Sequence, residues 1–222
     1  AVNNLLYLLN STESLDDNSR RFTQMAQEEL KRITHIVRQT LGFYREAANP
    51  SNLKISEVMR TVFELLERAI QRKRITITAD FEREISIEAF PGEMRQVFAN
   101  LIGNAIDALP VGGAITLRIH AARNPANLAQ LGVLCSVSDN GEGIRRGNRK
   151  SIFEPFFTTK GEKGTGLGLW VTHGIVSKHG GWIRVRSRTA PGRTGTTFLL
   201  FLPREFCGPR EKSNDINSEL SA

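Results

Sequence analysis

The apolar residues near the start of the chain recur with the spacing of a long amphipathic helix. Across residues 21–47 the intervals alternate between four and three, as in a helix that buries one heptad seam, and the seam consists of Ala26, Leu30, Ile33, Val37, Thr40 and Tyr44. Residues 1–10 predict the end of another apolar helix, and the polar residues 11–19 predict a loop with capping residues. We expect an antiparallel hairpin that forms a four-helix bundle with a second copy of the chain. The alternative is a hairpin packed on its own globular domain.

After a break at residues 49–52, the pattern changes to mixed helices and strands. Amphipathic or capped helices are predicted over residues 54–73, 91–109 and 166–179. Short alternating segments predict strands at 75–78, 85–87, 114–120, 131–138, 182–188 and 196–202. We therefore predict an α/β fold, a two-layer sandwich of a mixed, mostly antiparallel sheet with helices on one face. The expected domains are the helical hairpin at 1–49, the α/β domain at 50–204 and a polar, mobile tail at 205–222.

The composition excludes several classes of protein. The 222 residues are 40% hydrophobic and 24% charged, as in an ordinary globular protein, and no apolar run is long enough to span a membrane. The net charge of +7 comes from basic residues spread along the chain, so we do not expect nucleic acid as a partner. Cys135 lies in an apolar run and Cys207 lies far from it, which fits a reducing cytoplasm. The chain begins as if within a helix and without a signal peptide, so we expect a cytoplasmic fragment of a longer protein, and both a soluble and a membrane-anchored full-length protein fit this expectation.

A stretch of glycines and aromatics carries the main candidate chemistry. It contains Asp139-x-Gly141-x-Gly143 and, farther on, a second glycine run at residues 164–168. A carboxylate at a strand end can accept a hydrogen bond from the amino group of a base, and glycines beside it permit close approach of the backbone. Glycines that open a helix leave N–H groups free for an anion. The combination predicts a nucleotide site, although either motif alone also fits a turn or a flexible loop.

The helix predicted at 91–109 adds polar residues to this site. Asn100, Asn104 and Asp107 follow each other at intervals of four and three, which places them on one helical face. Amide and carboxylate oxygens suit Mg²⁺, which prefers hard oxygen ligands and shares them with substrate phosphates. Asparagines that only cap neighbouring backbone are the alternative for this pair.

These motifs occur in one order that resembles the ATP-binding domain of sensor histidine kinases. The segment Asn100 to Ala108 resembles the N box of that family, and Asp139 to Gly143 resembles its first glycine box. The segments 153–157, 164–168 and 195–198 are similar to its F box, second glycine box and last box. The match extends over about residues 54–203, and the preceding hairpin resembles the dimerisation domain of the same kinases.

The resemblance implies a role for each matching residue. Asp139 would accept from the adenine amino group, Thr196 would lie nearby and Gly143 would line the base. Asn104, with Asn100 close by, would hold Mg²⁺, and Lys160 would be a mobile counter-charge to the phosphates. Residues 141–164 would form a lid anchored by Phe153, Phe156 and Phe157. The implied ATP site comprises Asn100, Asn104, Asp107, Asp139, Gly141, Gly143, Ile144, Lys160, Gly164, Thr165, Gly166, Leu167, Gly168 and Thr196.

Asn100 also bears on the type of reaction. Relatives that hydrolyse ATP carry a glutamate at this position, whereas an asparagine cannot take a proton from water at neutral pH. The resemblance therefore implies transfer of the γ-phosphate to a histidine and relay to the receiver domain of a response regulator. The phosphoacceptor box itself is absent, and we expect it upstream of residue 1.

The histidines present are expected to be structural. His35 is expected on the solvated flank of its helix, His120 at a strand end and His173 within the helix beside the site, while His179 is expected as a cation at a helix C-terminus.

Three hypotheses follow for the function. The chain is the catalytic fragment of a kinase that dimerises through its hairpin, a nucleotide-gated scaffold without autokinase activity, or a phosphatase-biased regulator of a phosphorylated receiver.

Overall fold

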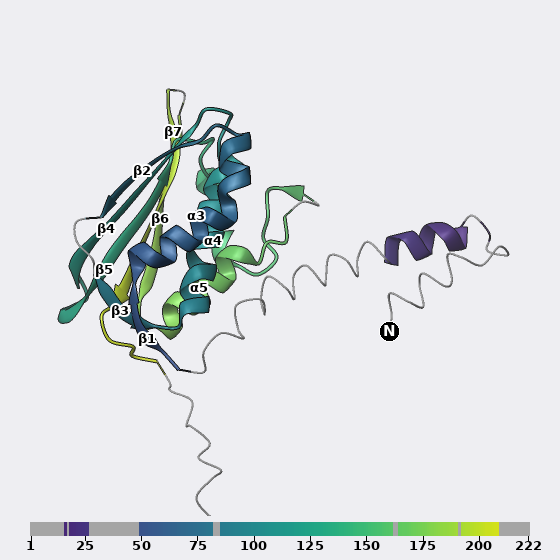
Figure 1. Cartoon of the computed structure of the whole chain (residues 1–222). Coiled ribbons are helices and arrows are strands. Elements are labelled where there is room, and N and C mark those ends of the chain that lie inside the picture. The colour runs from purple at the N-terminus through teal and green to yellow at the C-terminus, as the bar shows by residue number, and fades with distance from the viewer. Residues whose placement is uncertain are drawn as a thin grey trace, which may run out of the picture.

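The computed structural model describes residues 16, 18–26, 49–81, 85–161, 164–190 and 192–208 (Figure 1). In the region of the expected hairpin, residues 18–26 are helical. This helix begins inside the segment that we expected to be a loop, because the side chain of Asp16 accepts a hydrogen bond from the Ser19 N–H at 2.9 Å and so caps it. The other predictions for residues 1–47 and those for the end of the tail lie outside the described residues.

A five-stranded sheet forms one layer of the domain. Its strands are β2 (Thr76–Phe81), β4 (Ala114–Asn124), β5 (Asn127–Asp139), β6 (Trp182–Ala190) and β7 (Arg193–Pro203), in the order β2-β4-β5-β7-β6. The β2–β4 pair is parallel and the other three pairs are antiparallel, which confirms the mixed, mostly antiparallel sheet. The register places Asp139, at the end of β5, opposite Thr196 on β7. Two positions far apart in the sequence thus become neighbours.

Two short strands form a separate small sheet. Strand β1 (Ser51–Lys54) pairs antiparallel with β3 (Ser86–Ala89), with Ser51 opposite Ala89. We expected residues 49–52 to be a break between domains and did not predict β1. The segment Ser-Asn-Leu-Lys carries no local strand signal, so its extended form depends on the partner strand that the fold brings to it.

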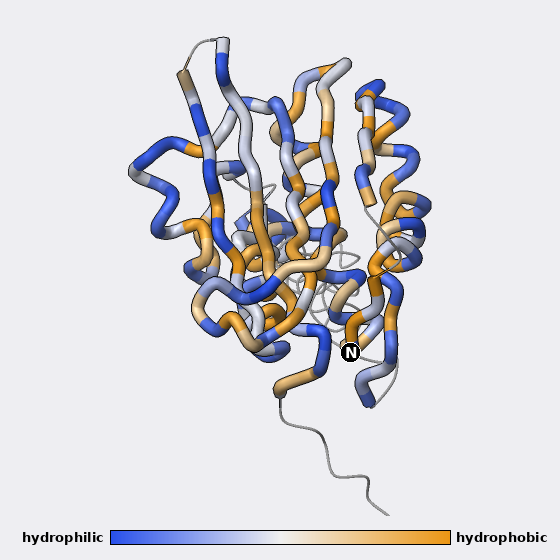
Figure 2. The backbone as a smooth tube through the Cα atoms, turned by 90° about the vertical axis from the view of Figure 1, so that its left-hand side faces the viewer, coloured by the Kyte–Doolittle hydropathy of each residue, from blue (hydrophilic) through white to orange (hydrophobic). Residues whose placement is uncertain are grey.

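Three helices cover one face of the large sheet: α3 (Ile55–Arg72), α4 (Pro91–Ala108) and α5 (Gly168–Lys178) (Figure 1). Their apolar residues and the inward positions of the strands form one core, in which Met94, Phe98 and Leu101 of α4 are fully buried. The opposite face of the sheet is turned to the viewer in Figure 2, where hydrophilic positions are frequent. Among the described helices, none is long and apolar enough to cross a membrane.

A lysine joins the ends of α3 and α4. The Nζ of Lys73, the residue after α3, donates to the carbonyl oxygens of Ile106, Asp107 and Leu109 at 2.6, 3.2 and 2.8 Å. The first two carbonyls belong to the last turn of α4 and Leu109 is its C-cap; that turn has no basic residue of its own. A cation at a helix C-terminus is favourable because the unpaired carbonyls carry partial negative charge. The contact fixes the end of the helix that presents the polar face to the site.

Candidate functional site

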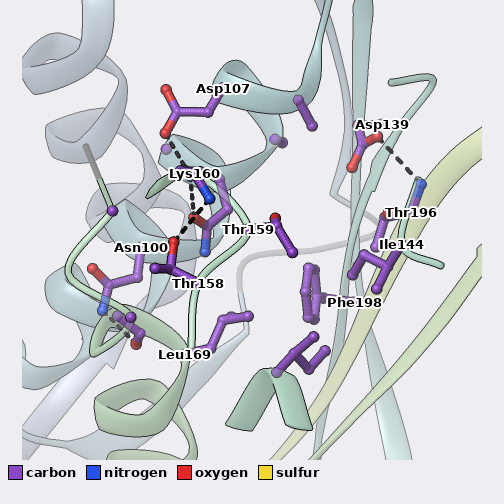
Figure 3. Close-up of a pocket in the computed structure, with 18 of the residues that line it drawn as sticks. Asn100, Asp107, Asp139, Ile144, Thr158, Thr159, Lys160, Leu169, Thr196 and Phe198 are labelled. Carbon is purple, nitrogen blue, oxygen red and sulfur yellow. Dashed lines mark hydrogen bonds and ion pairs between the residues drawn. The ribbon is translucent and has the colours of Figure 1, made fainter. Parts of the chain in front are cut away.

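A cavity of about 1100 Å³ lies between α3, α4, the start of α5, the segment that follows β5, and β7 (Figure 3). Most of the predicted site residues line it, namely Asn100, Asn104, Asp107, Asp139, Gly143, Ile144, Lys160, Gly164, Thr165, Gly166, Gly168 and Thr196. Gly141 and Leu167 do not. A cavity of this size is sufficient for a small organic ligand or cofactor. The fold therefore brings the five motifs to one place.

Asp139 forms one end of the cavity. Its Oδ1 accepts hydrogen bonds from the backbone N–H groups of Gly141 at 2.9 Å and Thr196 at 3.2 Å. Burial raises the pKa of this carboxyl group above its ordinary value, and the two N–H donors oppose that shift. Because both N–H bonds go to Oδ1, the other oxygen of the carboxylate can accept from a ligand.

A serine that we did not predict fixes the wall beside Asp139. The hydroxyl of Ser187, on β6, accepts a hydrogen bond from the Ile144 N–H at 2.7 Å and donates to the Gly195 carbonyl at 2.9 Å. It also lies 3.0 Å from the Thr196 hydroxyl, which can donate to it. These bonds tie the residue after the first glycine motif to the last two strands. No sequence motif includes Ser187, and only its alternation with exposed arginines on β6 distinguishes it.

A lysine occupies the other end of the cavity. The Nζ of Lys160 lies 3.0 Å from Asn104 Oδ1 and 2.6 Å from Asp107 Oδ2, although the lysine is 53 residues or more away in sequence (Figure 3). An amide oxygen and a carboxylate oxygen from adjacent turns of α4 thus converge on one positive group. Both oxygens are hard donors of the kind that Mg²⁺ takes from proteins. Residues Asn104 and Asp107 therefore fit a metal cation that enters together with phosphates.

Asn100 contacts α5 and does not join the lysine cluster. Its Nδ2 donates to the Gly168 carbonyl at 3.0 Å and to the Thr172 hydroxyl at 3.3 Å. The Thr172 hydroxyl in turn donates to the same carbonyl at 2.8 Å. These bonds hold the first turn of α5, including the end of the second glycine motif, against α4. A role for Asn100 as a metal ligand remains a prediction.

The glycines of the first motif are required by the protein's own backbone. A Cβ on Gly143, which has a φ of +78°, would lie 2.1 Å from the Arg188 carbonyl oxygen. On Gly141, it would lie 2.5 Å from the Ala108 carbonyl oxygen at the end of α4. These contacts show that the two glycines let the turn pass between α4 and β6. That Gly143, which lines the cavity, also makes room for a base stays a prediction.

The segment between the two glycine motifs contains two short 3-10 helices, η1 (Arg146–Asn148) and η2 (Ser151–Phe153). Phe153 and Phe157 are partly buried against the core, as expected of anchors. The prediction for Phe156 is wrong, because its side chain is 71% exposed. Phe156 has a φ of +65°, and its backbone leaves no space for a Cβ on Gly166, which would lie 2.3 Å from its carbonyl carbon. Phe156 therefore shapes the segment through its backbone.

Several apolar residues of the cavity wall were also missed. They are Leu65 and Leu66 of α3, Ile152 of η2, Leu169 of α5 and Phe198 of β7. Leu65 is 64% exposed, so it is a large apolar side chain that the core does not use. From the sequence, a leucine on an amphipathic helix is predicted to lie in the core. Only the position of α3 beside the cavity shows that Leu65 lines the cavity instead.

A buried polar cluster joins the start of α4 to the end of α5, at the opposite end of α4 from Lys160. His179, 2% exposed, donates from Nδ1 to the Ile175 carbonyl at 2.9 Å and accepts the Phe90 N–H at Nε2 at 3.4 Å. Burial lowers the pKa of His179, so our expectation of a cation at this helix end is wrong. The cation there is Lys178, whose Nζ lies 2.6 Å from Glu93 Oε1.

Comparison with known proteins agrees with this site. Residues 90–205 match the family described as histidine kinase-, DNA gyrase B- and HSP90-like ATPases, and this range covers more than half of the chain and all of the cavity lining except Leu65 and Leu66. The chain belongs to this family, and it contains the catalytic ATP-binding domain of a sensor histidine kinase. This confirms the resemblance on which the fold and the ATP ligand were predicted.

The similar proteins are mostly longer than this chain. Sensor kinase CckA of Brucella abortus (strain 2308) is 39% identical over 192 residues, which are 80% of this chain and 20% of CckA. The solved catalytic domain of histidine kinase ThkA is 30% identical with a TM-score of 0.61, covering 70% of this chain and 96% of that domain. The complex of ThkA with response regulator TrrA is 25% identical with a TM-score of 0.61, covering 91% of this chain and 56% of ThkA. The chain thus spans a fifth of the length of its curated relative CckA.

Proposed function

We propose that this chain binds Mg·ATP and transfers the γ-phosphate to a histidine on a dimerisation helix, for relay to an aspartate of a response regulator. The observation that carries the proposal is the cavity with a free carboxylate oxygen at one end and a cation held by amide and carboxylate oxygens at the other. A nucleotide needs both features: its base needs a hydrogen-bond acceptor for the amino group, and its polyphosphate needs a cation and oxygen ligands for the metal. The ThkA–TrrA complex supports a receiver domain as the partner.

In this reading, Asp139 accepts a hydrogen bond from the adenine amino group. Its carboxylate is oriented by the N–H groups of Gly141 and Thr196, so it loses little freedom when the base binds. Only the ionised form is a pure acceptor. Burial raises the pKa of Asp139, so the carboxyl group takes up a proton at a higher pH than an ordinary aspartate does. As the pH is lowered, adenine binding should therefore begin to weaken before the ordinary titration range of an aspartate is reached.

At the other end, Asn104 and Asp107 hold Mg²⁺ through their side-chain oxygens. Mg²⁺ neutralises phosphate charge when bound. Lys160 leaves these oxygens and turns to the phosphates, as its partly exposed position permits. Asn100, whose amide is engaged with α5, supplies no general base, so water is not activated and the phosphate passes to an incoming nucleophile.

Calorimetry with ATP, with and without Mg²⁺, tests the binding step. Asp139→Asn should weaken ATP and ADP alike, whereas Asn104→Ala should mainly reduce the effect of Mg²⁺ on ATP. Asp80→Asn is the matched control, because Asp80 is an exposed aspartate of β2 that is paired with Arg118 at 3.9 Å and does not line the cavity. No ATP binding by the unmodified chain, or equal losses in Asp80→Asn and Asp139→Asn, would refute the site.

The transfer step needs a protein that carries this chain with a phosphoacceptor helix. Incubation with γ-labelled ATP should give label that is acid-labile and base-stable, as on a histidine, and that moves to a receiver domain. Asn104→Ala should abolish the label. Tight ATP binding without any label would favour the nucleotide-gated scaffold over the kinase.

A further inference from the structure

A second hollow, of about 450 Å³, lies beside the β6–β7 hairpin, and its lining differs from that of the nucleotide cavity in being rich in arginine. Four arginines line it: Arg149 at the end of η1, Arg186 and Arg188 on β6, and Arg193 at the start of β7. Thr194 and Thr197 also line it. Within the described part of the chain, no ion pair shorter than 4.0 Å involves any of these arginines, in contrast to Arg118 and Lys178.

Among the described residues that line this hollow, only Asp139 is acidic. The Oδ1 of that carboxylate is held by two backbone N–H groups, as described above. The hollow therefore combines several guanidinium groups with at most one negative charge. Like charges gathered in one small space repel each other, and an anion that binds between them removes this repulsion.

We propose that this hollow binds a small, multiply charged phosphate compound. A guanidinium group presents N–H donors in a planar fork that matches the oxygens of a phosphate. The hollow has the volume of a small-molecule site, and four charges within it call for more than one phosphate group on a compact ligand. The proposal does not depend on the kinase reaction, because the four arginines that carry it do not line the nucleotide cavity.

The two sites share a wall, so the second ligand also acts on the first site. Arg149 Nε donates to the Ile144 carbonyl at 3.3 Å, and the Ile144 N–H donates to Ser187, which stands between Arg186 and Arg188 on β6. Ile144 lines the nucleotide cavity, and Asp139 lines both spaces. An anion that binds Arg149 therefore competes with the contact that supports Ile144.

Pyrophosphate titrated into the full chain by calorimetry tests the proposal. The double variant Arg186→Gln/Arg188→Gln should bind it at least about tenfold more weakly, as expected for the loss of charge-assisted hydrogen bonds. Arg184→Gln is the matched control: Arg184 lies on the same exposed face of β6, 4.6 Å from the Trp182 ring, and does not line the hollow. This control should bind pyrophosphate within about twofold of the unmodified chain, because Arg184 does not line the hollow and salt screens a charge that makes no direct contact with the anion.

Lys160→Met separates the two sites, since pyrophosphate could also bind where the phosphates of a nucleotide would lie. The proposal expects this variant to keep the arginine-dependent binding. Loss of binding in Lys160→Met and retention in the double variant would overturn it. Equal losses in Arg184→Gln and the double variant would also overturn it, because they indicate diffuse attraction to an arginine-rich edge strand. Citrate binding as tight as pyrophosphate binding would overturn the assignment to phosphate compounds.

Discussion

Removal of the Ser187 hydroxyl should destabilise the domain and loosen the nucleotide cavity. The side chain is 7% exposed, and its oxygen accepts the Ile144 N–H at 2.7 Å and donates to the Gly195 carbonyl at 2.9 Å. In Ser187→Ala, both groups lose their partner in a place with little access to water. A buried polar group left unpaired costs about 1–3 kcal/mol, so we expect the free energy of unfolding to fall by about 2–3 kcal/mol.

Urea denaturation followed by circular dichroism measures this loss, which should lower the midpoint without a change in the slope. ADP affinity should fall as well, because Ile144 lines the cavity. The matched control is Ser138→Ala on β5, which β7 separates from β6; the Ser138 hydroxyl accepts one bond from Thr197 at 3.0 Å on the less buried face of the sheet. That change should cost less than about 1 kcal/mol, since the Thr197 hydroxyl can turn to water. Equal stability losses in the two variants, with unchanged ADP affinity, would refute the reasoning.

Three further predictions concern the frame of the site. Lys73→Met should lower the free energy of unfolding by about 2 kcal/mol in the same assay, because the carbonyls at the end of α4 lose a charged donor; stability equal to that of the unmodified chain would show that water replaces it. The free energy of unfolding should fall as the pH drops from 6.5, the pKa of an unfolded histidine, towards the lower pKa of folded His179, because the unfolded chain takes up the proton first. His179→Gln should flatten this pH dependence while it leaves the Lys178–Glu93 ion pair in place. Gly143→Ala should cost about 2 kcal/mol or more and weaken ADP, whereas Gly147→Ala, whose Cβ meets nothing within 4 Å, should change neither. Similar values for the two alanine variants would contradict the steric argument.

The sequence predicted most of the helices and strands because their signals are local. Proline at the start of α4, alternating apolar positions in the long strands and glycines after α5 act over a few residues and gave boundaries close to the observed ones. Strand β1 was missed because it has no such signal and forms only beside β3. His179 was misjudged for a related reason, since its place at a helix end was visible but its burial between α4 and α5 was not.

For the site, the sequence alone determined which chemical groups are available, since the order of the motifs identified Asp139, Asn104 and the glycine runs. Only the tertiary structure decided how they are used. It set Lys160 between two oxygens of α4, gave Ser187 its role and assigned the glycines of the first motif to contacts with the protein's own backbone. The physical reason is that residue type fixes what a side chain can donate or accept, whereas its partners come from strands and helices that are remote in the sequence. Distances of this kind are properties of the packed fold.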